Sequence, residues 1–120
     1  MPSADAATAL AWIGARRSLI DERLSGVEAR LAAVREARGD WIDEEHDPEG
    51  FALTFEWQQA EGSRAEHLHE LAELDAAESR VHAGTYGVCL VCGQRIPDGQ
   101  LERGPARTTC VACADQPARR

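Results

Sequence analysis

Four cysteines are the residues of this chain whose type and spacing most clearly predict chemistry. They form two pairs, Cys89-Leu-Val-Cys92 and Cys110-Val-Ala-Cys113, separated by seventeen residues. A two-residue spacer lets one turn present two sulfurs to an ion, and the intervening loop brings the second pair round to complete a tetrahedral site. Gly93 follows the first pair and can take the positive φ that such a turn often needs. The pattern predicts one structural Zn²⁺ bound by Cys89, Cys92, Cys110 and Cys113.

Other uses of these cysteines are disfavoured. Disulfides need an oxidising compartment, and no apolar secretory segment opens the sequence. A redox Cys-x-x-Cys is typical beside a βαβ pattern, which is not recognisable here. Four cysteine ligands leave zinc no position for a reactive water, and His67, His69 and His82 fall on a predicted helix without a paired nucleophile. We therefore expect no enzyme activity and no catalytic residues.

Charge is unevenly distributed over the 120 residues. The net charge is −8, and between Asp40 and Arg80 thirteen acidic residues stand against two arginines. Such a segment would repel nucleic acid, because binding there depends on neutralising phosphates with a basic surface. The sequence also has no run of about eighteen apolar residues, as a membrane span would need. We expect a cytoplasmic protein that binds neither nucleic acid nor a membrane directly.

The elements that must position the zinc site are predicted to be helical. Pro2-Ser3 with Asp5 is typical of a helix start, and Gly39-Asp40 of a helix end. Asp47-Pro48 then indicates the start of a second helix, which Gly84 ends. In the first helix apolar residues recur at steps of three and four, as in a coiled coil; they are Leu10, Ile13, Ile20, Leu24, Val27, Leu31 and Val34, with Trp41 beyond them.

The two predicted helices can pair as an antiparallel hairpin. In the best register Arg17, a charged residue in the first stripe, lies opposite Glu78, and Arg38 lies beside Trp57. The poorest match is Leu31 opposite Arg64. The register also sets the following apolar residues opposite one another: Ile13 and Val81, Ile20 and Leu74, Leu24 and Leu71, Val34 and Ala60, Trp41 and Leu53.

The predicted architecture is mainly α. We expect a long antiparallel coiled-coil hairpin over residues 1–84, a small four-cysteine zinc-finger module over residues 85–115 and a disordered tail over residues 116–120. The finger is too small to hold itself together without metal. Its few apolar residues are Tyr86, Ile96, Leu101 and Val111, and we expect it to pack against Leu10, Trp12 and Val81.

Acidic residues concentrate at the predicted hairpin tip, at about residues 40–50. They form either a solvated acidic loop or a contact surface directed at a bound Mg²⁺ or at basic residues in a partner's cleft. The candidates for partner contact are Asp43, Glu44, Glu45, Asp47 and Glu49.

These features together resemble the DksA/TraR family of bacterial zinc-finger transcription regulators. The resemblance is most specific over Gly84-Thr-Tyr-Gly-Val-Cys-Leu-Val-Cys-Gly93 and the closing cysteine pair. It implies a regulator that binds RNA polymerase directly, without binding DNA, and inserts its acidic tip into the secondary channel to modulate promoter-complex stability. It also implies guanosine tetraphosphate as a candidate effector, and we expect a monomer.

The chain departs from the family pattern in two places. The tip lacks the family's Asp-x-x-Asp-x-Ala pattern, so that Asp43, Asp47 and Glu49 are only positional counterparts. The family's Leu-Glu-Ala-Arg-Pro is Leu101-Glu-Arg-Gly-Pro105 here, with the arginine displaced by one residue. The alternative function is a zinc-dependent adaptor that dimerises, or binds another protein, through its coiled coil.

Overall fold

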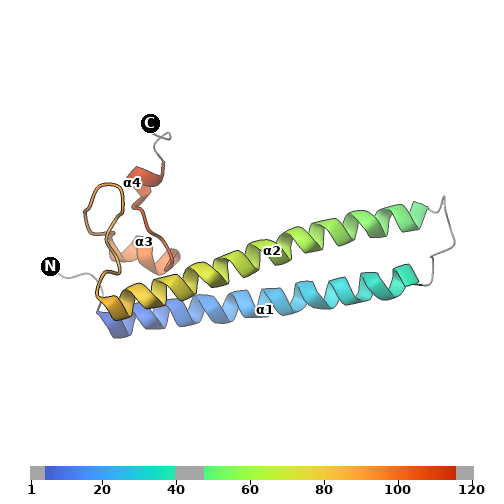
Figure 1. The fold of residues 1–120 in the computed structure, drawn as a ribbon, viewed down its shortest axis with the longest axis horizontal. Coiled ribbons are helices and arrows are strands. Elements are labelled where there is room, and N and C mark those ends of the chain that lie inside the picture. Colours follow the sequence, from blue (N-terminus) through green and yellow to red (C-terminus); the bar gives the residue numbers. More distant parts are fainter. Residues whose placement is uncertain (1–4, 40–47, 116–120) are drawn as a thin grey trace. The chain divides into compact units, whose positions relative to one another are not determined.

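The described part of the chain forms two long helices and two short ones. The computed structural model of the chain describes residues 5–39 and 48–115. Its helices are α1 (Ala6–Gly39), α2 (Pro48–Ala83), α3 (Asp98–Arg103) and α4 (Val111–Ala114), with α1 and α2 antiparallel (Figure 1). Within the described ranges the β structure is a single isolated bridge between Val88 and Arg95. The prediction of a mainly α hairpin with a small cysteine-bearing module is confirmed.

The start of α1 is set by Asp5. Its Oδ1 accepts a hydrogen bond of 2.7 Å from the Thr8 N–H, and so satisfies one of the backbone donors that a helix start leaves free. The same bond lowers the pKa of the Asp5 carboxyl. The sequence placed Asp5 in the first turn of a helix starting at Pro2-Ser3; the structure places it just before Ala6, as the cap itself.

The end of α2 turns the chain into the finger. Gly84 has a φ of +78°, a conformation that residues with a Cβ rarely adopt. Its N–H donates to the Val81 carbonyl at 3.1 Å, and the Thr85 N–H donates to the Arg80 carbonyl at 2.9 Å. This pair of bonds is the Schellman motif, which ends a helix sharply. The predicted stop at Gly84 is confirmed.

The chain divides into two compact units. We call Met1–Ser18 with Leu71–Arg120 the finger unit, and Leu19–Glu70 the helical unit. Along the described part of the chain, no helix is long and apolar enough to cross a membrane. The predicted division at residues 84 and 115 stays a prediction.

In the finger unit, the first turns of α1 pack against the last turns of α2. Ile13, Leu74 and Ala77 are fully buried together, with Val81 packed beside them. Arg17 lies next to this core and donates through Nη2 to Asp75 Oδ1 and Glu78 Oε1, both at 2.9 Å. Partial burial disfavours the charged guanidinium, but the two carboxylates outweigh it and raise the pKa of Arg17. The predicted Arg17–Glu78 pair is confirmed.

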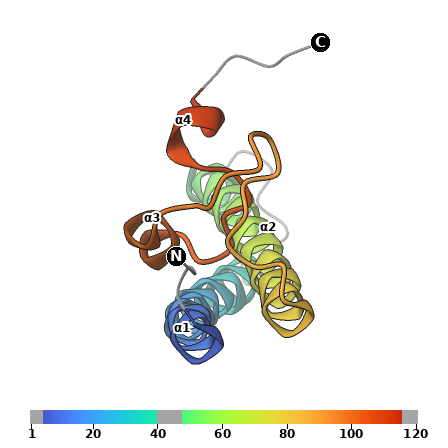
Figure 2. The ribbon, with the colours of Figure 1, turned by 90° about the vertical axis from the view of Figure 1, so that its left-hand side faces the viewer.

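A second core lies within the finger itself. Cys89, Ile96 and Leu101 are buried, and Trp12 from α1 packs against them. Figure 2 shows α3, which carries Leu101, next to the start of α1. Tyr86 joins both cores, and its hydroxyl donates to the Pro105 carbonyl at 2.7 Å.

The finger contacts predicted from the sequence are confirmed for most of their residues. Tyr86, Ile96 and Leu101 lie in the finger core, Trp12 packs against it, and Val81 packs beside Tyr86 in the neighbouring core. Val111 was wrongly expected among them. It is 40% exposed, because the single turn of α4 directs it outward.

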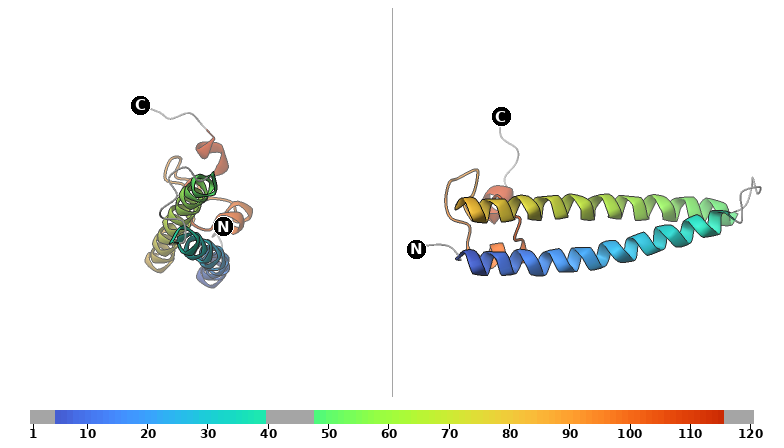
Figure 3. Two further views of the ribbon diagram at one scale, coloured as in Figure 1. Left: turned by 90° about the vertical axis from the view of Figure 1, so that its right-hand side faces the viewer. Right: turned by 60° about the horizontal axis from the view of Figure 1, so that its bottom comes forward.

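In the helical unit, α1 and α2 lie side by side (Figure 3). They share a small buried core. Val27, Leu31 and Ala60 are buried there, and Trp57 packs against them. Arg35 lies over the Trp57 ring, at 5.4 Å from its centroid. The side chain of Arg38, predicted beside Trp57, lies outside the described residues, so that this part of the predicted register stays a prediction.

The predicted Leu31–Arg64 pair would bring a charged side chain next to an apolar one. Arg64 and Leu31 line one surface pocket, and Arg64 pairs through Nε with Glu28 Oε2 at 3.4 Å. Leu31 packs with Ala60 in the buried core. Trp41 and the tip residues Asp43, Glu44, Glu45 and Asp47 lie outside the described residues, as does the predicted tail. Glu49 belongs to the first turn of α2.

Candidate zinc centre

The first cysteine pair lies on a tight turn. The Cys89 N–H donates to the Gln94 carbonyl at 2.8 Å, and the Gly93 N–H donates to the Cys89 carbonyl at 2.9 Å. Gly93 has a φ of +75°, as predicted from the sequence. The turn directs the Cys92 N–H toward the Cys89 sulfur, at 3.5 Å. Backbone donors facing a sulfur in this way favour its thiolate form.

The second pair is positioned by the start of α4. Cys110 is the residue before the helix, and Cys113 follows one turn later. The helix is held by a side chain from α3, since Gln100 Oε1 accepts the Val111 N–H at 2.9 Å. Each cysteine pair lies on a short turn, which we call a zinc knuckle. The Leu90 N–H of the first knuckle donates to the Thr108 carbonyl, just before the second, at 2.9 Å. Gln100 and Thr108 were not singled out by the sequence, because neither residue type is itself a metal ligand.

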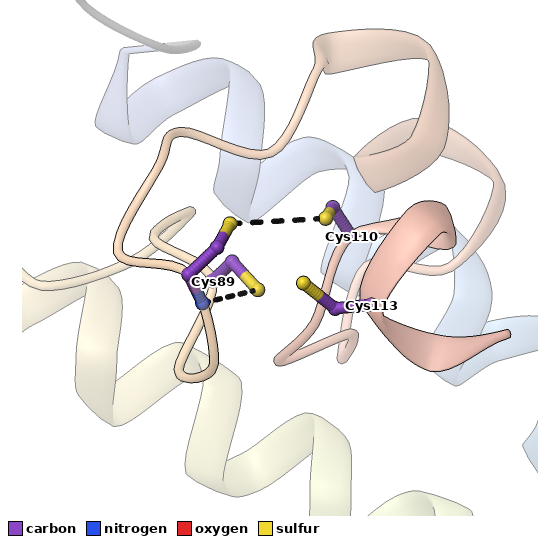
Figure 4. A group of neighbouring side chains, drawn as sticks. Cys89, Cys110 and Cys113 are labelled. Atoms are coloured by element: carbon purple, nitrogen blue, oxygen red, sulfur yellow. Dashed lines mark hydrogen bonds between the residues drawn. The ribbon is translucent and has the colours of Figure 1, made fainter. Parts of the chain in front are cut away.

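The four sulfurs converge on a common point. All four Sγ atoms lie within 4.8 Å of one another. Figure 4 shows the sulfurs of Cys89, Cys110 and Cys113 facing the same space. The Cys92 and Cys110 sulfurs are 4.0 Å apart, close to the edge of about 3.8 Å in a tetrahedron with Zn–S bonds of about 2.3 Å. The predicted ligand set is thus brought together in a geometry that fits one zinc ion.

The thiols of the site have strongly different proton affinities. Donation from the Cys92 and Cys110 N–H groups lowers the pKa of Cys89 to about 6. Hydrogen bonding to the Cys110 thiol, with burial, raises the pKa of Cys113 to about 12. Sulfurs this close cannot all carry charge without a cation between them. Zinc binding must therefore displace protons, and the affinity for zinc should increase with pH.

Burial also differs among the four cysteines. Cys89 is buried beside Ile96 and Leu101, Cys110 and Cys113 are half-buried, and Cys92 is exposed. One side of the site therefore belongs to the finger core and the other faces solvent. Since four sulfurs complete a zinc coordination shell, the centre is structural.

The fold and site define a protein with a two-helix hairpin and a C4-type zinc finger. Residues 84–116 match the family model of the prokaryotic dksA/traR C4-type zinc finger. The family prediction made from the sequence is confirmed on this ground: the chain carries the DksA/TraR zinc finger, with one structural zinc.

Two further similarities extend beyond the finger. An uncharacterized protein of Aquifex aeolicus (strain VF5) is 26% identical over 104 residues, which cover 84% of this chain and 72% of that protein. The solved structure of transcription factor DksA2 from Pseudomonas aeruginosa has a TM-score of 0.52 with this fold at 20% sequence identity. That match covers 88% of this chain and 81% of the DksA2 chain. At this identity the match shows that the fold is shared.

Proposed function

We propose that this protein is a transcription regulator that binds RNA polymerase directly through its coiled-coil hairpin, without binding DNA. The observation that carries the proposal is a DksA/TraR-type four-cysteine finger that directly follows an antiparallel helical hairpin. The fold shared with a transcription factor, DksA2, supports the same role. In this proposal residues 1–84 supply the hairpin and residues 85–115 the finger.

Zinc has a structural role in the proposed function. Cys89, Cys92, Cys110 and Cys113 would bind the ion, which closes the finger around Ile96 and Leu101. Trp12 and Tyr86 connect this core to α1 and to the end of α2. Loss of zinc should therefore loosen the base of the hairpin, and polymerase binding should depend on the metal.

The acidic segment supplies the proposed regulatory contact. Asp43, Glu44, Glu45, Asp47 and Glu49 give a high local density of negative charge. Inserted into the polymerase secondary channel, such carboxylates would interact with the active-site Mg²⁺ or with basic residues of mobile catalytic elements. The proposed result is a change in promoter-complex stability.

A binding and transcription experiment tests both parts. Zinc-loaded protein should capture purified core RNA polymerase, and a chelator should abolish capture. The triple variant D43A/D47A/E49A should retain capture but lose at least tenfold of the effect on promoter-complex lifetime. Asp21→Ala, which removes an exposed carboxylate from α1, is the matched control and should behave as the unmodified protein.

Two outcomes would contradict the proposal. If core polymerase is not captured by zinc-loaded protein, the polymerase-binding role is wrong. A full transcriptional effect in the triple variant would refute the tip assignment and favour the adaptor alternative. Repeating the lifetime assay with guanosine tetraphosphate tests that nucleotide as an effector.

A further inference from the structure

The finger unit carries a groove that the zinc site does not use. Its volume is about 340 Å³, at the small end of the range of roughly 300–1,000 Å³ typical of ligand sites. None of the four cysteines lines it. The lining residues are Arg80, Gly84, Thr85, Gly87, Val88, Leu90, Arg107 and Thr108.

The apolar part of the groove is unusually exposed for so small a module. Val88 is 43% exposed and Leu90 is 74% exposed. Leu90 directly follows Cys89 in the first knuckle. Cys89 is buried in the finger core, and Leu90 lies outside it. Large aliphatic side chains on an exposed surface are typical of a contact site.

Two arginines make the same groove positively charged. Arg80 Nη2 donates to the Ala106 carbonyl at 3.4 Å, and Arg107 Nη1 donates to the Thr109 carbonyl at 3.0 Å. Both acceptors are uncharged, so these bonds fix the guanidinium groups without neutralising them. None of the eight lining residues is acidic. The groove therefore suits a segment that combines carboxylates with a bulky apolar side chain.

The sequence itself contains one segment of that chemistry. Residues 40–47 are Asp-Trp-Ile-Asp-Glu-Glu-His-Asp, which places five carboxylates around a tryptophan and an isoleucine. A symmetric contact between two grooves would instead bring Arg80 and Arg107 of both copies together, and like charges at a desolvated contact are costly. Charge complementarity thus favours an asymmetric contact between the groove and the acidic segment.

We propose that the groove lined by Val88, Leu90, Arg80 and Arg107 binds residues 40–47 of a second copy of this chain. The contact does not depend on the proposed function. If both hold, self-association covers the carboxylates assigned to the polymerase contact, and the protein competes with its own partner as its concentration increases.

The test uses a fluorescein-labelled peptide with the sequence of residues 40–47, added to the zinc-loaded full chain. Fluorescence anisotropy should show saturable binding that weakens as salt increases, because the contact joins opposite charges. Leu90→Glu should weaken binding at least tenfold. Val91→Glu is the matched control, since Val91 is adjacent and 62% exposed but does not line the groove. Its affinity should stay within twofold, and both variants should retain one zinc.

Sedimentation equilibrium of the full chain tests whether the occupant is a second copy. The mean mass should rise above the monomer value of 13.1 kDa with concentration. The rise should be lost in Leu90→Glu and in Trp41→Ala but kept in Val91→Glu.

The proposal is overturned if the peptide does not bind, or if both glutamate variants weaken peptide binding equally. A chain that stays monomeric while the peptide binds would also refute it. Capture of core polymerase by Leu90→Glu is measured separately. Because Leu90 lies outside the acidic segment assigned to the polymerase contact, failure of self-association can be told apart from failure of polymerase binding.

Discussion

The finger unit and the helical unit are stabilised in different ways. In the finger unit, Trp12 of α1, Tyr86 of the connecting loop and Leu101 of α3 meet around the zinc cysteines. Among the described residues of the helical unit, the core comes from α1 and α2, along a line through Val27, Leu31 and Ala60. Two facing helices can each bury only one stripe, whereas a third segment with a metal closes a core on more sides. Perturbations should therefore affect the two units unequally.

Zinc removal should have the largest effect and should separate the units. Structural zinc supplies about 10–16 kcal/mol to small fingers, so chelation or Cys89→Ser should unfold the finger. The helical unit has no cysteine and should keep its helices. In a W41F/W57F background, emission from Trp12 should shift to the red on chelation while the far-UV circular dichroism retains most of its helical signal. Unchanged Trp12 emission would refute the coupling between the finger and α1.

Core truncation gives the next largest effect. Leu101→Ala removes a fully buried side chain beside Ile96 and Cys89, and should destabilise the zinc-loaded protein by about 3–5 kcal/mol. Leu31→Ala in the helical unit should cost about 2–3 kcal/mol, because the narrow core there can relax toward solvent. Urea unfolding followed by circular dichroism measures both. Equal losses would mean that the two cores are equally well packed.

Glycine-to-alanine substitutions should change the free energy of unfolding in opposite directions at the end of α2 and inside the helices. Gly84→Ala forces a Cβ into a positive φ and should destabilise the end of α2 by about 1–2 kcal/mol. Gly26 and Gly62 lie within α1 and α2, and a Cβ at either would meet nothing within 4 Å. Gly26→Ala and Gly62→Ala should each stabilise the helical unit by about 0.5–1 kcal/mol. Thermal unfolding of the three variants measures whether each one is stabilised or destabilised. If Gly26→Ala is destabilising, the expected gain from removing a glycine inside the helix is wrong.

The ion pairs should contribute least. Arg17 bridges two carboxylates next to a buried core, so Arg17→Ala should cost about 1 kcal/mol at low salt. Arg64 makes one longer contact to Glu28 on the helical unit, and Arg64→Ala should cost no more than about 0.5 kcal/mol. Raising the salt concentration in urea unfolding should reduce both losses. If Arg64→Ala lowers the free energy of unfolding more than Arg17→Ala does, the expected ranking of the two ion pairs is wrong.

Short-range patterns made the zinc site and the helix boundaries predictable from the sequence. Cysteine spacing fixes which sulfurs share a knuckle, and Gly84 and Gly93 mark positions where only a positive φ continues the chain. The register of the helical unit is less sharply defined by the sequence, because the α2 stripe contains Arg64 and His67. Charged or polar residues on a stripe weaken the apolar match that sets a register.

Features built from distant residues could not be predicted. Val111 was expected in the core on hydrophobicity alone, but its exposure depends on how α4 is held by Gln100. The groove on the finger joins Arg80 at the end of α2 to Arg107 in the loop before the second knuckle. No local pattern connects these residues, because their proximity depends on the completed fold.

The finger unit combines the two ends of the described chain, since Trp12 packs against a core completed by Cys110 and Cys113. During synthesis the first helix leaves the ribosome long before the second cysteine pair, so Trp12 has no complete finger core to cover until Cys110 and Cys113 have been translated. Contacts between residues so far apart in sequence form late in folding. A nascent chain that lacks the second cysteine pair would therefore expose this surface to chaperones and proteases, whereas a metal-loaded molecule with both pairs would conceal it.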